Sequence, residues 1–440
     1  MGIVSPRGLP KEEEAAKLDQ LVTGLIEPDG NQLLEAVRGQ AAAQLERQGL
    51  PTVRDELFRH FPLRQFYAKQ LVVAQPPKSK PSLPPCEKGY GRLVFVNGHF
   101  VPAWSDWHLL PKELMIQPLE EAFVSYGAFL SNQFQRSLKG ETDPMALING
   151  AYFGRGAFIY LPANCCSDVP LELLSVVDTG EETALVLPRL HLFMGANSQL
   201  QLVQREHLLS GKGSVLMRSV EAQLDPSSHL SLLQLKGDRE ADRWSFDTFR
   251  AVLKANSFVD GVEVVRGGGC SRWDGRLLLQ GEGAHADLAG LALLEGKSQA
   301  HVDLLIRHAA PDCPSRQLFK NLLRGASRSS FQGKIYVERE AQKTDAFQLN
   351  NNLLLSDEAR AYSQPNLEIF ADDVKASHGS TAGALDDEQL FYLCARGLEP
   401  RSAESMLIEA FCRQLMDRIR LPLFAEEVAA SVREYAALGS

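Results

Sequence analysis

Residues 331–370 read "FQGKIYVEREAQKTDAFQLNNNLLLSDEARAYSQPNLEIF", and this stretch decides the fold class. Short apolar pairs such as Ile335 with Val337 and Leu367 with Ile369 alternate with polar positions within it. Gly, Asn, Asp and Pro separate these pairs. The pattern indicates several short β-strands joined by turns.

The same pattern extends over residues 141–385, where helical periodicity is nearly absent, so we predict a mainly β core there. A sandwich, a propeller and a parallel β-helix are all compatible with it, because the spacing between the apolar runs varies. The three asparagines at 350–352 and the frequent single glycines favour the β-helix. Its corners stack short polar residues coil upon coil, about 4.8 Å apart.

Residues 1–140 predict a helical N-terminal region that also contains a Pro-rich linker and a hairpin. Apolar residues recur at helical spacing over residues 11–49, with a break at 28–30 that divides two helices. The Pro-rich residues 75–89 predict an exposed, extended connector. Asn97-Gly98 favours the positive φ angles of a tight hairpin, and a helical pattern follows at 117–138.

Residues 386–440 predict a C-terminal helical domain. Asp386 is placed to cap a first helix, with Gln389 three residues on and Leu390 on its apolar stripe. A second helix carries Leu407 and Phe411 on one face, and a third ends the chain.

Composition excludes several classes of protein. The 440 residues carry a formal net charge of −9 without a long basic run, so nucleic acid is not expected as the partner. No stretch approaches the roughly 18 apolar residues that span a bilayer, and the N-terminus lacks the apolar segment of a signal peptide. We therefore expect a cytoplasmic protein without membrane contact, whose seven cysteines are reduced thiols.

Motifs for catalysis or nucleotide binding do not emerge from the sequence. Residues 290–298 are "GLALLEGKS", with five residues between the two glycines where a P-loop needs four. The segment therefore predicts a strand followed by a turn. His301 and His308 should lie on opposite faces of one strand, as should the adjacent Cys165 and Cys166, of which one is expected to be buried. We expect a non-catalytic chain that binds no nucleotide.

Residues 331–398 closely resemble the C-terminal signature of the SufB and SufD family. The matching runs are "AQKTDA" at 341–346, "NLLLS" at 352–356, "LEIFADDVK" at 367–375, "SHG" at 377–379 and "LFYLCARG" at 390–397. Weaker similarity lies in "GAFIYLP" at 156–162 and in "GLPTVRDE" at 49–56.

The resemblance implies a right-handed parallel β-helix between helical ends, and a scaffold role in the SUF system of iron-sulfur cluster assembly. A SufB-like subunit would pair with this chain through the β-helices. A SufC-like ABC ATPase would dock on the C-terminal helices, on or behind Leu390, Leu407 and Phe411. The cargo would be a transient iron-sulfur cluster, or iron, shared with the partner, and the resemblance leaves open a homodimer when the partner is missing.

His378 matches the histidine of the family's "SHG" motif, which makes it the candidate iron or cluster ligand at the partner interface. A neutral imidazole is a competent iron ligand. Asp372 and Asp373 offer oxygen ligands nearby, although adjacent strand residues face opposite ways. Ala376 stands where the family often has cysteine, which favours the SufD branch of the family and weakens the case that this chain holds a cluster alone.

Two rival hypotheses remain at this point. A β-helix lyase or hydrolase of polysaccharides would use clustered carboxylates, for which Glu368, Asp372 and Asp373 are candidates. The other rival is a purely structural partner with no metal role.

Overall fold

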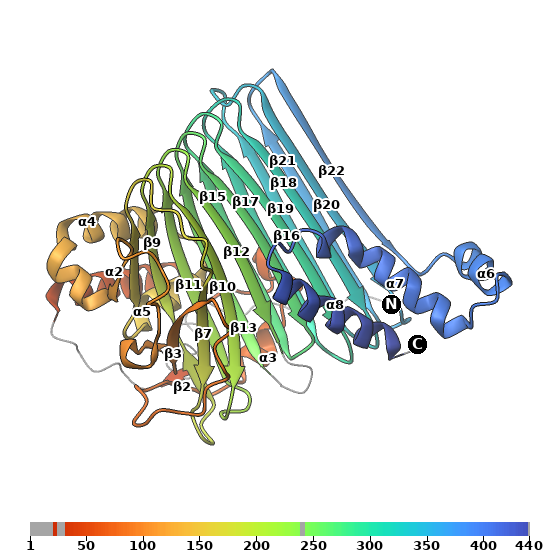
Figure 1. Ribbon diagram of the computed structural model, residues 1–440, viewed down its shortest axis with the longest axis horizontal. Helices are drawn as coiled ribbons and strands as arrows, with labels where there is room; N and C mark the ends of the chain where they lie inside the picture. Colours follow the sequence, from red (N-terminus) through yellow and green to blue (C-terminus); the bar gives the residue numbers. More distant parts are fainter. Residues whose placement is uncertain (1–20, 24–30, 238–242, 439–440) are drawn as a thin grey trace.

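The computed structural model describes residues 21–23, 31–237 and 243–438. Within these residues the chain forms a parallel β-helix of two facing sheets, with helices at both ends (Figure 1). The predicted mainly β class and the β-helix core are confirmed.

The first sheet has 12 strands within the described chain. They are β1 (Val22–Thr23), β2 (Leu71–Val73), β5 (Met115–Pro118), β6 (Ala157–Leu161), β8 (Ala184–Val186), β9 (Arg189–Met194), β11 (Val215–Leu224), β13 (Trp244–Leu253), β15 (Cys270–Leu279), β17 (Gln299–His308), β19 (Arg328–Val337) and β21 (Arg360–Ile369).

The second sheet has 10 strands within the same residues. They are β3 (Gly91–Val96), β4 (His99–Phe100), β7 (Leu171–Val177), β10 (Gln199–Leu208), β12 (His229–Lys236), β14 (Phe258–Arg266), β16 (His285–Leu294), β18 (Pro314–Leu323), β20 (Thr344–Leu354) and β22 (Val374–Gly383). From β10 onward, successive strands of the chain alternate between the two sheets.

Parallel pairing sets the length of each coil. Cys270 of β15 pairs with Gln299 of β17, and Gln299 pairs with Arg328 of β19, so each of these coils takes 29 residues. Side chains alternate between the interior of the solenoid and its outer surface. Leucine, valine and phenylalanine side chains from both sheets therefore meet inside in one apolar core.

One corner of the solenoid is a column of residues with positive φ. Asn197, Ser227 and Asn256 have φ values of 57°, 60° and 55°. The Ser227 N–H donates to the carbonyl of Ala255 in the next coil at 2.9 Å, and the Asn256 N–H donates to Glu282 at 2.9 Å. The predicted stacking of short polar residues at corners is confirmed there, because asparagine and serine tolerate this backbone conformation.

The asparagines at 350–352 serve a different purpose from the one predicted. They lie within strand β20 rather than at a corner. Asn350 and Asn352 are buried, and the Asn321 Nδ2 group donates to Asn352 Oδ1 at 2.7 Å across neighbouring strands. These residues belong to a polar ladder inside the solenoid.

Helices of the N-terminal region cover part of the outer face of the first sheet. They are α2 (Gln32–Gln48), the short η1 (Glu56–Phe58) and α3 (Leu63–Tyr67), α4 (Leu119–Lys139) and α5 (Pro144–Tyr152). The short η2 (Pro102–Trp104) packs instead against β3 of the second sheet. Leu34, Phe123 and Met145 from three of these helices share one apolar cluster with Trp244 and Phe246 of β13.

Two features of this region depart from the sequence prediction. Helix α5 lies where helical periodicity is nearly absent, and its residues from Pro144 to Gly150 are all buried. A helix buried on every side has no polar stripe, so its period is invisible in the sequence. The helix expected before residue 28 falls mainly outside the described residues, but Val22–Thr23 forms a short strand that pairs with β2.

The predicted hairpin and connector are confirmed. Val96 pairs with His99 across Asn97 and Gly98, whose φ values are 54° and 87°. The connector at 75–89 is extended, and Arg92 anchors it by donating to the carbonyls of two prolines. Strands β2, β3 and β5 pair with core strands, so both sheets begin before residue 141.

Three C-terminal helices follow the last strand: α6 (Asp387–Ala395), α7 (Pro400–Met416) and α8 (Pro422–Ala437). The Asp386 side chain caps α6 as predicted, accepting from the N–H groups of Glu388 and Gln389 at 2.9 and 3.3 Å. Helices α7 and α8 pack on the outer face of the second sheet (Figure 1), where Ile408 and Phe424 join its apolar residues. In the described part of the chain, no helix has the length and apolar character needed to cross a bilayer.

The interior of the solenoid also holds a cluster of three cations and three carboxylates. Its members are Arg218, Lys236, Arg243, Glu206, Asp247 and Glu263, whose side chains are all buried. The Arg218 side chain donates twice to Asp247, at 2.5 and 2.9 Å, and Lys236 Nζ lies 2.6 Å from the same carboxylate. Lys236 also pairs with Glu263. Burial raises the pKa of Glu263, and Lys236 opposes that rise.

Replacing Lys236 with Met should lower the free energy of unfolding by about 3–5 kcal/mol, because Asp247 and Glu263 would lose a shared buried cation. Without that cation the folded-state pKa of Glu263 rises further above its unfolded value. The loss should therefore be larger at pH 8 than at pH 5. Urea unfolding at both pH values measures it.

A matched control is Lys254→Met. The Lys254 side chain is 41% exposed and pairs with Asp225 at 2.7 Å. Its replacement should therefore lower the free energy of unfolding by less than about 1 kcal/mol. Equal losses for the two variants would contradict a structural role of the buried cluster.

Candidate functional site

The last coil of the solenoid, formed by β21 and β22, has an open edge (Figure 1). Strand β21 pairs with β19, and β22 pairs with β20. Over the described ranges, no further strand joins either sheet at this end. Half of the backbone N–H and C=O groups of these two strands are therefore available for pairing with another chain.

His378 lies on β22 and faces the interior side of this open coil. Val374 and Ala376 pack against the apolar cluster at this end, and alternate residues of a strand share a face. Gly379 faces outward, where an added Cβ would lie 3.2 Å from Leu349 Cδ1. His378 is nevertheless exposed, because it belongs to the terminal coil. The histidine is thus presented at the mouth of the solenoid.

The acidic residues near His378 in the sequence do not join it in space. Asp372 and Asp373 are exposed in the turn before β22, and the Asp373 N–H donates to Gln342 Oε1 at 2.9 Å. A strand rises about 3.3 Å per residue, so Asp373 and His378 are separated by about 16 Å. Glu368 forms an ion pair with Lys334 at 2.5 Å on the outer face of the first sheet.

The described residues contain no group of three His, Cys, Asp or Glu side chains arranged to hold a metal ion. Ala376 occupies a partly buried position on the same face as His378. At the open end this chain therefore supplies one imidazole. The remaining ligands of any iron at this place would come from another molecule.

The other histidines and cysteines singled out in the sequence are structural. His301 and His308 are both buried on opposite faces of β17, and hydroxyls of Ser330 and Ser315 lie 2.7 and 3.0 Å from their ring nitrogens. Burial lowers the pKa of His301 to about 3 and that of His308 to about 4. Cys165 is buried in the core while its neighbour is exposed, as expected.

The segment that resembles a P-loop is a strand and a turn, as predicted. Residues 290–294 belong to β16, and the Ser298 N–H donates to the carbonyl of Glu295 in the turn that follows. The glycines at 267–269 likewise join β14 to β15.

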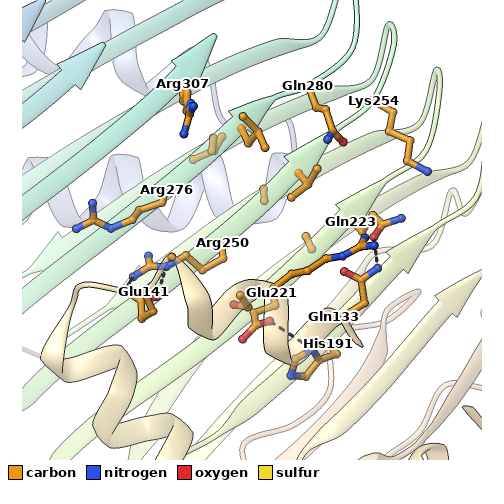
Figure 2. A pocket seen from close by; sticks show the side chains of 18 of the residues that line it. Gln133, Glu141, His191, Glu221, Gln223, Arg250, Lys254, Arg276, Gln280 and Arg307 are labelled. Atoms are coloured by element: carbon orange, nitrogen blue, oxygen red, sulfur yellow. Dashed lines mark hydrogen bonds and ion pairs between the residues drawn. The ribbon is translucent and has the colours of Figure 1, made fainter. Parts of the chain in front are cut away.

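Figure 2 shows an open groove of about 480 Å³ between helix α4 and the outer face of the first sheet. Arg250 Nε lies 2.7 Å from Glu141, and Lys254 and Arg307 each have a carboxylate partner as well. His191 is buried beneath the groove, and burial lowers its pKa well below the usual range. The pair of Arg250 with Glu141 binds the segment after α4 to the sheet, whereas the pairs of Lys254 with Asp225 and of Arg307 with Glu338 lie within the solenoid.

The three residues expected to dock a partner have the same degree of exposure. Leu390, Leu407 and Phe411 are all half-buried. Phe411 packs against the apolar cluster under α7, and its carbonyl accepts from Lys320 Nζ at 2.7 Å. Phe411 thus lies behind the outer surface rather than on it.

Larger apolar side chains stand on the outer surface of these helices. Phe391, Tyr392 and Met406 are 75%, 56% and 51% exposed. They were not among the predicted docking residues, although Phe391 and Tyr392 lie between Leu390 and Leu393 of the predicted apolar stripe of α6. Adjacent apolar residues in a helix cannot all lie on one stripe, so some of them must be exposed. This pattern is what identifies the exposed apolar residues from the sequence.

Two family models match the chain. A model described as the SufBD core domain of the SUF system for iron-sulfur cluster assembly matches residues 176–411. A second, described as the SufBD protein N-terminal region, matches residues 11–173.

Individual relatives agree with these models. The chain is 28% identical over 435 residues to the iron-sulfur cluster assembly protein SufD of Escherichia coli, covering 97% of both chains. It is 27% identical over 428 residues to an iron-sulfur cluster assembly SufBD family protein of Synechocystis, covering 94% of this chain and 92% of that protein. A chloroplastic protein of Arabidopsis thaliana, ABCI7, is 29% identical over 59% of this chain.

Proposed function

Because the chain belongs to the SufBD family of iron-sulfur cluster assembly proteins, we propose that it is a SufD-type scaffold subunit with no catalytic step of its own. The observation that carries the proposal is the open last coil, which presents paired strand edges and one imidazole together. Iron or a nascent cluster is the cargo of this scaffold. Its expected cytoplasmic location stays a prediction.

The open edges of β21 and β22 support pairing with a SufB-like subunit. A strand edge adds a neighbouring strand by ordinary backbone hydrogen bonds, and the neighbour also covers the interior side chains of the last coil. Solenoids need such a cover, because a terminal coil leaves one face of its core uncovered. When the partner is missing, two copies of this chain pair through the same edges.

His378 contributes one ligand at that interface. A single neutral imidazole binds iron weakly, whereas an imidazole combined with thiolates of a partner completes a cluster site. Ala376 brings no thiolate to the same face, so the partner supplies the sulfur ligands. The iron or cluster is therefore shared between the two subunits, and no nucleotide is bound by this chain.

The C-terminal helices α6 and α7 dock a SufC-like ABC ATPase. Exposed Phe391, Tyr392 and Met406 provide apolar anchors, and Met406 lines a groove on α7. Large apolar side chains on a surface mark protein contacts. Helices α7 and α8 themselves are anchored on the solenoid, so a movement of the ATPase is transmitted to the second sheet.

The polysaccharide hypothesis loses its basis, because Glu368 is ion-paired on the outer face of the first sheet and the adjacent aspartates lie in a turn. A purely structural role without iron differs from the proposal only in what His378 does, so variants of that residue separate the two.

His378→Ala should leave the complex with the SufB-like subunit intact and lower the yield of assembled cluster several-fold, because one ligand is removed. Size-exclusion chromatography measures assembly, and visible absorption of the cluster measures yield. His108→Ala is the control, since its side chain is 71% exposed at a distant loop. An undiminished yield in His378→Ala would favour the purely structural role.

Ser380→Arg should weaken binding of the SufB-like subunit at least about tenfold, because it places a charge on the interior face of the open edge strand. Titration calorimetry with the purified partner gives the affinity. Gln135→Arg adds the same charge to exposed helix α4 and should change nothing. Equal affinities for both variants would place the interface elsewhere.

Phe391→Asp combined with Met406→Asp should reduce ATPase binding about tenfold or more while the SufB-like subunit still binds. Point variants are preferable to deletion after Asp386, because removing α7 and α8 would uncover the apolar face of the second sheet. Val124→Asp, at a position 83% exposed on α4, is the control. Retained ATPase binding would refute this docking site.

A further inference from the structure

Buried polar atoms lie directly beneath the open end of the solenoid. Gln348 and Asn350 of β20 are 2% and 0% exposed and face the interior. Among the residues that the structure describes, Gln348 Oε1 and Asn350 Nδ2 have no hydrogen-bond partner. An unsatisfied buried acceptor destabilises the folded state, so a donor that reached Gln348 Oε1 would be bound favourably.

The amide of Gln348 is held in one orientation. Its Nε2 donates to Gln317 Oε1 of the neighbouring strand β18 at 2.9 Å. Gly333 of the facing sheet leaves the necessary room, because a Cβ there would lie only 1.9 Å from Gln348 Nε2. Since the amide nitrogen points toward β18, the oxygen lies on the other side of the group, toward β22.

His378 lies beside Gln348 on the neighbouring strand β22. Gln348 and His378 are register partners in the parallel pair of β20 and β22. Neighbouring strands are about 4.8 Å apart, and both side chains project from the interior face of the second sheet. The last coil therefore places a ring N–H of His378, a possible donor, beside Gln348.

We propose that Gln348 is a positioning residue for His378: its side-chain oxygen accepts a hydrogen bond from one ring N–H, so that the other ring nitrogen is unprotonated and faces the partner subunit. The inference rests on the proposed role of His378 as an iron ligand. It deepens that role by naming what fixes the imidazole.

The chemical reason is the tautomerism of histidine. A neutral imidazole carries one proton, and only the nitrogen without it has a lone pair for a metal. Histidine ligands in metal sites commonly donate their second N–H to an oxygen acceptor, which fixes the ring and strengthens the ligand. The ladder from Gln317 through Gln348 would supply that acceptor from the interior of this chain before any partner binds.

The test is the tautomer of His378, read from ¹⁵N chemical shifts of histidine-labelled full-length protein at pH 8, with His378→Ala to assign the signal. The wild-type ring should show one dominant tautomer. Gln348→Leu should relax it to the mixture of an unrestrained histidine, and Gln348→Glu, which keeps an acceptor oxygen, should restore it. The same mixture in wild type and Gln348→Leu would overturn the proposal.

A second readout uses Co²⁺ as the probe in the complex with the SufB-like subunit. Gln348→Leu should weaken Co²⁺ binding about tenfold to a hundredfold. Gln234→Leu is the matched control, because Gln234 makes the same buried contact with Gln204, at 2.6 Å, far along the same sheet. Equal weakening by both variants would mean a general loss of stability and would also overturn the proposal.

The positioning role of Gln348 and the iron role of His378 can be refuted separately. If the tautomer responds to Gln348→Leu but His378→Ala leaves the cluster yield unchanged, the positioning stands and the iron role of His378 is wrong. If His378→Ala lowers the yield and the tautomer ignores Gln348, the ligand role stands and the positioning is wrong.

Discussion

Coil-on-coil parallel pairing is the constraint on which this structure depends. The backbone N–H and C=O groups of each coil form hydrogen bonds with those of the coil before it. The N–H groups of the positive-φ corner residues likewise donate to carbonyls of the next coil. Such a ladder has no means of closing on itself, in contrast to a barrel. Within the described residues the strand ladder ends at β21 and β22, and the proposed function follows from what lies at that end.

The interior of the solenoid has a second consequence. It is apolar over much of its length, but it contains an ion cluster near Lys236 and a ladder of amides near the open end. Buried polar groups stabilise a fold only when each has its partner. The ion cluster pairs three cations with three carboxylates deep within the solenoid, whereas the amide ladder ends at the open coil, where Gln348 is the register partner of His378. The position of the amide ladder at the open end is what suits it to orient a ligand-bearing side chain.

Much of the architecture could be predicted from the sequence, because strand alternation, the Asn97-Gly98 turn and the Asp386 cap are local signals. Helix α5 could not, since burial on all sides removes the amphipathic period. The asparagines at 350–352 indicated the right fold, but they lie within a strand and not at the predicted corner. Which way a side chain points depends on the register of the strands, which the sequence alone does not show. His378 could be named from its motif, but Gln348 lies 30 residues away, and only the pairing of β20 with β22 brings the two together.

The central claim is that the open last coil is the surface that receives the sister subunit. Hydrogen-deuterium exchange of the full-length chain, with and without a SufB-like partner, tests it most directly. If the last coil receives the partner, amides of β21 and β22 should become protected on binding while those of α4 should not change. Unchanged exchange in both terminal strands within a formed complex would contradict it.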